Sequence, residues 1–545
     1  MAQTMSPVAR LWNLVREEKS EISAIYFFAI CNGLIQLTLP VGIQTFIGFV
    51  VSGTLSASIT VLITVLVLAV LLAGIIRVNQ MKVIEKIQQR IFVHYAYAFA
   101  DRIPRLDLKK VDGTYLPELV NRFFDTMSLQ KSFSKLLLDL PLASISILFG
   151  LILLSFYHPF FILFGILILF LLWIILRYTG PGGLQSSLAE SSFKYGLVGW
   201  LEEMARLVKS FKFSSGDLHI RKADAKTSNY LEARTRHFSV LEFQYKVLVA
   251  FKVIITAAML IVGTLLLLDQ QINIGQFVAA EIIIITIIAS TEKIISNLDS
   301  VYDIMTAVEK IAKLTDKPIE NGGTYSLEES EMIAITAKNL SFGYDDNPIF
   351  KDLNFDIQPG EKVCIKGRDG SGKSTLLKLL SGVYKDFKGQ LLVNNVPIAN
   401  YELLPLRKKM GILFQHENIF HGSLWENLTM DTPGITRGFI NELCQKTGLQ
   451  SFLSGLPHGY DTQLDPAGKQ LPRSVVQKIM LVRALAHRPS LLILEEPFHG
   501  IEESFRHSIE KLILGIENTT VIVATADEQF ANKCNLVIHL KDTSQ

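Results

Sequence analysis

The chain is short of charge and of cysteine for its length. Charged residues make up 19% of its 545 positions and hydrophobic residues 49%, which is more apolar than an average soluble protein. The net charge of +2 gives no general basis for nucleic-acid binding. The four cysteines are Cys31, Cys364, Cys444 and Cys534. Because their wide spacing forms neither a metal-binding pattern nor a disulfide framework, we expect reduced structural thiols.

The apolar residues are concentrated before about residue 300. Six windows there approach the roughly 20 apolar residues that a membrane-spanning helix needs. They cover residues 23–50, 54–77, 135–157, 159–178, 245–268 and 274–297. One such window could be a buried core helix, but six in half a chain predict a six-helix transmembrane domain.

The flanks of these spans predict their orientation. Residues 1–20 are amphipathic and lack the apolar core and cleavage site of a signal peptide. Basic residues before the first span and after the second are Arg10, Arg16, Arg77, Lys82, Lys86 and Arg90. Since cytoplasmic loops carry the excess of basic residues, both termini are expected in the cytoplasm, beneath the inner membrane.

Internal connections are longer than external ones. The external loops lie at about 51–56, 157–159 and 269–273, and the internal segments at about 78–134 and 179–244. The internal segments are polar but have helical periodicity, so we expect the spanning helices to continue far into the cytosol. The alternative is a separate soluble insertion, although neither segment has a strand-rich core.

The composition changes after the sixth span. Residues 300–314 continue as a helix, and then Pro318, Gly322 and Gly323 mark a connecting segment. From about residue 332 the sequence alternates short strands with helices, as in an α/β domain. The predicted division is a transmembrane domain at 1–315, a linker at 316–330 and an α/β domain at 331–545.

One run in the α/β domain has the full phosphate-loop pattern, with an apolar strand before it and a helix after it. The run is Gly367-Arg368-Asp369-Gly370-Ser371-Gly372-Lys373-Ser374-Thr375. Its glycines let the main chain approach phosphate oxygens, and the following helix adds its positive N-terminal end. Lys373 can reach the terminal phosphates and the Ser374 hydroxyl can bind Mg²⁺. The alternative, a glycine-rich turn, leaves Lys373 unexplained, so we predict binding of ATP with Mg²⁺.

A second motif lies about 120 residues further on. Four apolar residues, 491–494, predict a buried strand that ends in Glu495 and Glu496. One carboxylate can hold the magnesium ion and the next can orient or deprotonate a water molecule. Because acidic residues often end strands, this motif indicates a nucleotide site only in combination with the phosphate loop upstream.

With these motifs the chain resembles the ATP-binding-cassette exporters over nearly its whole length. The resemblance implies a half-transporter, with an all-α six-helix transmembrane domain followed by an α/β P-loop nucleotide-binding domain. Tyr344 matches the aromatic residue that stacks on adenine in the family, and Gln415 matches the glutamine that senses magnesium and contacts the membrane domain. Glu496 matches the catalytic glutamate. Residues 113–125 and 201–211 resemble the two coupling helices of such exporters.

The signature motif departs from the family pattern. The usual Leu-Ser-Gly-Gly-Gln reads Leu471-Pro472-Arg473-Ser474-Val475 here. Pro472 replaces the phosphate-contacting serine, and Arg473 puts a bulky cation where glycine normally lets the main chain approach phosphate. We expect Ser474 to cap the following helix. Either Arg473 and Ser474 supply an altered phosphate contact, or the composite site is weakened.

Three further departures affect the same chemistry. Ala526 stands where the family has a histidine that donates to the γ-phosphate, and Glu495 stands where it has aspartate. The D-loop, usually Ser-Ala-Leu-Asp, reads His499-Gly500-Ile501-Glu502. Since Lys373 and Glu496 are kept, the sequence predicts intact ATP binding and weakened hydrolysis.

The resemblance implies a dimer whose second half is either an identical chain or a different half-transporter. The leading hypothesis is ATP-driven export, with periplasmic accessory proteins as further partners and no nucleic acid. The alternative is a nucleotide-binding regulatory or structural half that does not turn over ATP. A third alternative, an ATP-gated channel, would need many polar residues along the spans. The spans contain few, and the main ones are Gln36, Gln44 and Glu281. Glu281 is a candidate for substrate contact, because intramembrane carboxylates are rare and functional.

Overall fold

The computed structural model describes residues 5–52, 57–328, 331–344, 347–415, 418–466 and 471–540. The external loop expected at about 51–56 therefore lies mostly outside the described residues. The chain forms two compact units. The first comprises Met1–Leu106 and Gly113–Pro318, and the second comprises Asp107–Asp112 and Ile319–Gln545.

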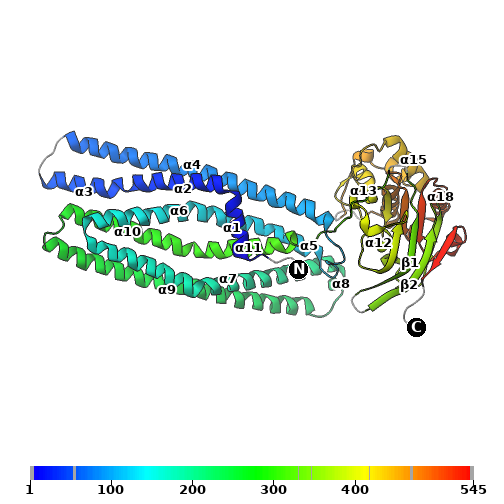
Figure 1. The fold of residues 1–545 in the computed structure, drawn as a ribbon, viewed down its shortest axis with the longest axis horizontal. Coiled ribbons are helices and arrows are strands. Elements are labelled where there is room, and N and C mark those ends of the chain that lie inside the picture. Colours follow the sequence, from blue (N-terminus) through cyan, green and yellow to red (C-terminus); the bar gives the residue numbers. More distant parts are fainter. Residues whose placement is uncertain are drawn as a thin grey trace. The chain divides into compact units, whose positions relative to one another are not determined.

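The first unit is entirely helical in its described part. Its α-helices are α1 (Pro7–Glu17), α2 (Lys19–Gln36), α3 (Thr38–Val51), α4 (Ala57–Arg102), α5 (Leu116–Val120), α6 (Asp125–Tyr157), α7 (Ile162–Arg206), α8 (Val208–Lys212), α9 (Leu218–Leu268), α10 (Ile274–Ser296) and α11 (Leu298–Thr315). Short 3₁₀ helices occupy Ile103–Arg105, Asn121–Phe124 and Pro159–Phe161. Within this unit α7 runs beside α9 and α6 beside α10 (Figure 1).

Six helical segments of the described chain are long and apolar enough to cross a membrane, which confirms the predicted six-helix transmembrane domain. Helices α4, α7 and α9 contain 46, 45 and 51 residues. At 1.5 Å per residue α9 is roughly 75 Å long, well beyond the thickness of a bilayer. Residues 179–206 and 218–244 are thus continuations of α7 and α9, and the alternative of a separate soluble insertion is wrong.

The first span differs from the single helix expected over 23–50. It is interrupted at Leu37, where α2 ends and α3 begins. Pro40 explains the interruption, because proline has no N–H to donate to the carbonyl four residues earlier, which is that of Gln36. The chain therefore turns from one helix to the next near the middle of the span.

The second unit has the α/β architecture. Its strands are β1 (Ile335–Tyr344), β2 (Asn347–Ile357), β3 (Lys362–Lys366), β4 (Lys388–Val393), β5 (Val396–Pro397), β6 (Met410–Leu413), β7 (Gly422–Ser423), β8 (Gln463–Leu464), β9 (Leu491–Glu495), β10 (Thr520–Ala524) and β11 (Leu536–His539). Its α-helices are α12 (Lys373–Leu380), α13 (Leu403–Lys408), α14 (Leu424–Thr429), α15 (Arg437–Thr447), α16 (Gln450–Ser454), α17 (Arg473–Leu485), α18 (Glu503–Leu514) and α19 (Glu528–Ala531). Three-residue 3₁₀ turns lie at Ile398–Asn400 and Gly459–Asp461.

Two main sheets organise this unit. A parallel sheet has the strand order β11-β3-β10-β9-β6, and a mainly antiparallel sheet has the order β2-β1-β4-β5. Strands β9 and β10 are buried at every position, as expected for the centre of a parallel sheet. Because β3, β9 and β10 run in the same direction, their carboxyl ends meet at one edge, where α/β proteins place their ligand sites.

Candidate nucleotide site

The phosphate loop lies where the sequence pattern predicts it, between β3 and α12. Gly370 and Gly372 have φ angles of +84° and +91°, which side chains other than glycine rarely adopt. A Cβ atom on Gly372 would lie 2.3 Å from the side chain of Ile349. The loop can therefore keep this curvature only with glycine at these positions.

Two polar groups of the loop suit an anionic ligand. The Lys373 ammonium donates to the main-chain carbonyls of Gly367 (2.7 Å) and Arg368 (3.1 Å) and lies 3.7 Å from the exposed carboxylate of Asp369. The Ser371 hydroxyl is buried and has no hydrogen-bond partner among the described atoms. Since an unpartnered buried hydroxyl is costly, the loop fits phosphate oxygens as its missing partners.

The residues predicted to hold magnesium lie together. The Ser374 hydroxyl donates to one carboxylate oxygen of Glu495, and the main-chain N–H of Gln415 donates to the other at 3.0 Å. The described residues contain no cluster of three or more His, Cys, Asp or Glu that could hold a metal alone. A hydroxyl with one carboxylate is the sparse donor set with which proteins bind Mg²⁺ on a nucleotide phosphate.

Glu496 is held in an unusual backbone conformation with φ +44°, outside the range that non-glycine residues normally adopt. Its carboxylate accepts hydrogen bonds from the Thr525 hydroxyl at 2.9 Å and from the Ala526 main-chain N–H at 3.2 Å. Its own N–H donates to the carbonyl of Ala524 at 2.8 Å. These bonds fix the carboxylate at the carboxyl end of β10. Glu496 itself directly follows the neighbouring strand, β9.

Sequence reasoning missed the contribution of Thr525 to the site. The signal that could have found it is the parallel arrangement of β9 and β10, in which Ala524 lies opposite Glu495. The residues that follow each strand are then neighbours. The main chain of Ala526 therefore contacts Glu496 although its side chain can donate no hydrogen bond.

Tyr344 lies beside the phosphate loop. Its hydroxyl is 3.4 Å from that of Thr375, and its ring packs edge-on against Phe342 and Tyr384. The neighbouring residues 345–346 lie outside the described part. Burial raises the pKa of Tyr384, so its hydroxyl stays protonated and donates to Asp112 at 3.0 Å. The aromatic cluster gives Tyr344 a fixed position at the edge of the site.

The altered signature segment opens helix α17. Pro472 is the N-cap residue and Arg473 the first helical residue, and no side chain caps this end. The expectation that Ser474 caps the helix is wrong, because Ser474 already lies in the first turn, past the capping position. One turn later, Lys478 donates to Glu502 at 2.7 Å, a hydrogen bond that lowers the pKa of the Glu502 carboxyl and joins α17 to the altered D-loop.

The segments that resemble coupling helices have local helical structure. Residues 113–125 contain α5 and a following 3₁₀ helix, and residues 201–211 contain the end of α7 and most of α8. Their coupling role stays a prediction.

The fold and the site together define a multi-pass membrane protein with a P-loop nucleotide-binding domain. Residues 22–291 match the family model of the ABC transporter transmembrane region, and residues 350–499 match that of the ABC transporter. The chain belongs to the ABC transporter family and has the domain composition of a half-size exporter. Membership in this family implies ATP binding and agrees with the predicted fold class.

Known relatives agree with this assignment. The chain is 28% identical over 260 residues to the ATP-dependent lipid A-core flippase of Syntrophus aciditrophicus, covering 47% of this chain and 40% of the relative. It is 29% identical over 268 residues to the leukotoxin export ATP-binding protein LtxB of Aggregatibacter actinomycetemcomitans, covering 48% of this chain and 37% of the relative. These matches span less than half the length of either relative.

A solved structure supports the fold over nearly the whole chain. It is described as the structure of a bacterial Atm1-family ABC exporter with ATP bound. Its TM-score is 0.81 at 17% sequence identity, and the match covers 96% of this chain and 94% of that one. At this identity the likeness concerns the fold alone.

Proposed function

We propose that this chain is one half of a dimeric exporter that uses ATP hydrolysis to move a substrate out across the cytoplasmic membrane. The observation that carries the proposal is the gathering of Lys373, Ser374, Glu495 and Glu496 at one sheet edge, in a chain whose described residues contain six candidate spans. In this proposal residues 1–315 form the transmembrane domain, 316–330 the linker and 331–545 the nucleotide-binding domain. Both termini lie in the cytoplasm.

Each site residue has a chemical role in this proposal. The ammonium of Lys373 exchanges two carbonyl partners for phosphate oxygens, and the main-chain N–H groups of the glycine loop bind the same phosphates. Mg²⁺, held by Ser374 and Glu495 with Gln415 beside them, would supply positive charge against the phosphate oxygens. Tyr344 would stack on the adenine ring.

Glu496 is the general base in this proposal. Its carboxylate is oriented by Thr525 and by the N–H of Ala526, and each oxygen accepts one of these bonds and keeps a lone pair that can take a proton from an attacking water molecule. The positive φ of Glu496 stores backbone strain, which is common at catalytic positions. The carboxylate is therefore set in place before nucleotide binds.

The altered motifs support slow or unequal hydrolysis. Pro472 at the start of α17 carries no N–H, so it removes a donor from the end that would close over a partner's nucleotide. Ala526 offers only its main chain. In a homodimer both sites would carry these changes. In a heterodimer the partner's signature would complete the site of Lys373 and Glu496, while Pro472 and Arg473 would weaken the partner's site.

The second candidate function is a regulatory or structural half that binds ATP without turning it over. The same residues, Pro472, Arg473 and Ala526, favour it. Periplasmic accessory proteins fit either candidate, since export across an outer membrane would require them.

The first experiment measures ATP hydrolysis by the purified full-length protein in lipid nanodiscs, with Mg²⁺ and with EDTA. Replacing Pro472→Ser, Arg473→Gly, Ser474→Gly, Val475→Gln and Ala526→His together should raise turnover by at least about tenfold, because donors to the γ-phosphate are typically worth that much or more. Absence of any Mg²⁺-dependent hydrolysis in the natural assembly would favour the regulatory half. An active wild-type enzyme without a gain would show that other features limit the rate.

A further inference from the structure

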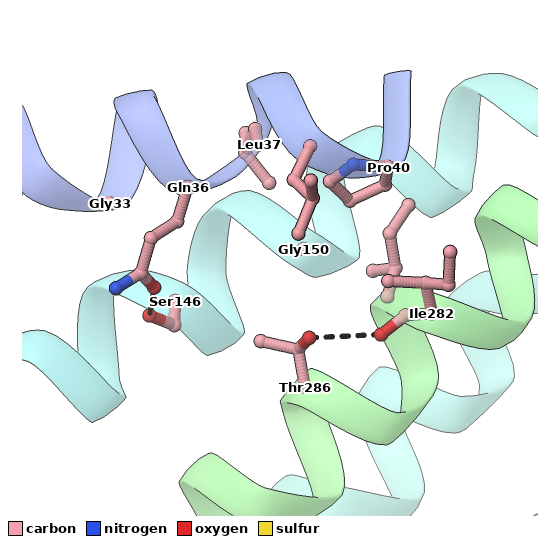
Figure 2. A pocket seen from close by; sticks show the side chains of 10 residues that line it. Gly33, Gln36, Leu37, Pro40, Ser146, Gly150, Ile282 and Thr286 are labelled. Atoms are coloured by element: carbon pink, nitrogen blue, oxygen red, sulfur yellow. Dashed lines mark hydrogen bonds between the residues drawn. The ribbon is translucent and has the colours of Figure 1, made fainter. Parts of the chain in front are cut away.

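A cavity lies inside the first unit, at the point where the first span is interrupted. Its volume is about 180 Å³, and helices α2, α3, α6 and α10 contribute its walls. The residues that matter for its chemistry are Gly33, Gln36, Pro40, Ser146, Gly150 and Thr286 (Figure 2). A cavity of this size has room for more than one water molecule, and hence for a chemical group of a ligand.

The polar groups of the cavity each come from the middle of a candidate span. Gln36, Ser146 and Thr286 stand near the middle of the first, third and sixth spans, at 23–50, 135–157 and 274–297. Three spans therefore each bring a hydrogen-bonding side chain to the centre of the hydrocarbon layer. Secondary transporters, a different class of transport protein, commonly place substrate sites near the middle of the bilayer, beside interrupted helices.

These side chains have unused hydrogen-bonding capacity. The Gln36 amide N–H₂ reaches Asn32 only at 3.5 Å, and the Ser146 hydroxyl reaches the Gln36 carbonyl oxygen at 3.4 Å, both at the limit of a hydrogen bond. Thr286 donates to the carbonyl of Ile282 at 2.9 Å, which leaves its oxygen free to accept (Figure 2). A ligand group that both accepts and donates would complement the Gln36 amide and the Thr286 oxygen.

The cavity excludes charge. None of the described residues that line it is ionisable. A charged group at this depth would have no partner of opposite sign, and burying an unpaired charge in the hydrocarbon layer is expensive. The remaining wall consists of aliphatic side chains and of glycines; a Cβ atom on Gly150 would lie 3.0 Å from Ile287.

We propose that this cavity binds an uncharged hydroxyl or carboxamide group of a mainly apolar substrate, through Gln36 and Thr286. The inference rests on the proposed export function and assigns its substrate class. Glu281 is not part of this cavity; one of its carboxylate oxygens is buried without a described partner, and its role stays a prediction.

The test uses photo-crosslinking to the full-length protein in lipid nanodiscs. The probes are three matched dodecyl chains that carry a diazirine and end in a hydroxyl, an amine or a carboxylate. The alcohol should label peptides that contain residues 33–40, 146–150 and 282–286 more strongly than either charged probe. Labelling is read by mass spectrometry, so the outcome does not depend on ATP hydrolysis.

The isosteric variant Thr286→Val and the variant Gln36→Leu should each lower labelling by the alcohol about fivefold, as expected for one lost hydrogen bond. Thr64→Val is the matched control, because Thr64 on α4 makes the same bond to its own helix, to the carbonyl of Thr60 at 2.8 Å, outside the cavity. Equal labelling by all three probes, no labelling by the alcohol, or full labelling of Thr286→Val would each overturn the proposal. The proposed ATPase function would stand in all three cases.

Discussion

Replacing Glu496→Gln is expected to lower ATP hydrolysis by at least about a hundredfold, the usual contribution of a general base. Glutamine keeps the size and one of the two oxygens that accept from Thr525 and from the Ala526 N–H, but it cannot take a proton from water. ATP affinity should stay within about twofold, since the lost carboxylate does not contact the phosphate loop. Turnover is measured by phosphate release and affinity by binding of a fluorescent ATP analogue.

The control for this variant is Glu442→Gln. Glu442 is an exposed glutamate on α15 that pairs with Lys446 and lies outside the site, so its variant should hydrolyse ATP like the wild-type protein. If Glu496→Gln keeps wild-type turnover while this control behaves as expected, the base lies elsewhere. Should the wild-type protein itself be inactive, this variant gives no information on turnover, and the absence of hydrolysis favours the regulatory half.

Replacing Lys373→Ala should weaken ATP binding by about a hundredfold. The Lys373 ammonium lies within 3.1 Å of two main-chain carbonyls of the phosphate loop, so it is positioned to move onto a phosphate oxygen. A hydrogen bond to a charged group contributes about 1.5–3 kcal/mol, and this variant loses at least one. Binding is measured by titration at fixed Mg²⁺, with the thermal unfolding midpoint recorded to show that the variant is folded.

Lys446→Ala provides the comparison for this second variant. Lys446 forms an exposed pair with Glu442 at 2.6 Å, and such surface pairs contribute little to stability or to the distant site. Its ATP affinity should equal that of the wild-type protein. Tight binding by Lys373→Ala would show that the main-chain N–H groups of the loop and the helix end suffice, and would remove the lysine from the proposed mechanism.

The extent to which the site could be predicted varies from residue to residue. Local patterns predicted the strand before the phosphate loop and the helix after it. They also predicted the places of Lys373 and Ser374, because these residues stand at fixed offsets from the glycines of the loop. The contact between Glu496 and Thr525 joins residues 29 positions apart, so no local pattern contains it. The prediction that Ser474 caps a helix was wrong for a local reason. The sequence pattern does not give the first residue of α17, which is Arg473, so it does not give the capping position either.

The sequence by itself determined the six spans, the order of the two units and the presence of a phosphate loop. Each of these depends on composition or on spacing within a few dozen residues, where hydrophobic periodicity and glycine geometry act locally. Only the tertiary structure decided that Ser374, Gln415 and Glu495 meet at one sheet edge. It alone brought Gln36, Ser146 and Thr286 around one cavity. These neighbours come from segments that are distant in the sequence. Their relative positions are set by the packing of parallel strands and of antiparallel helices, which no single segment encodes.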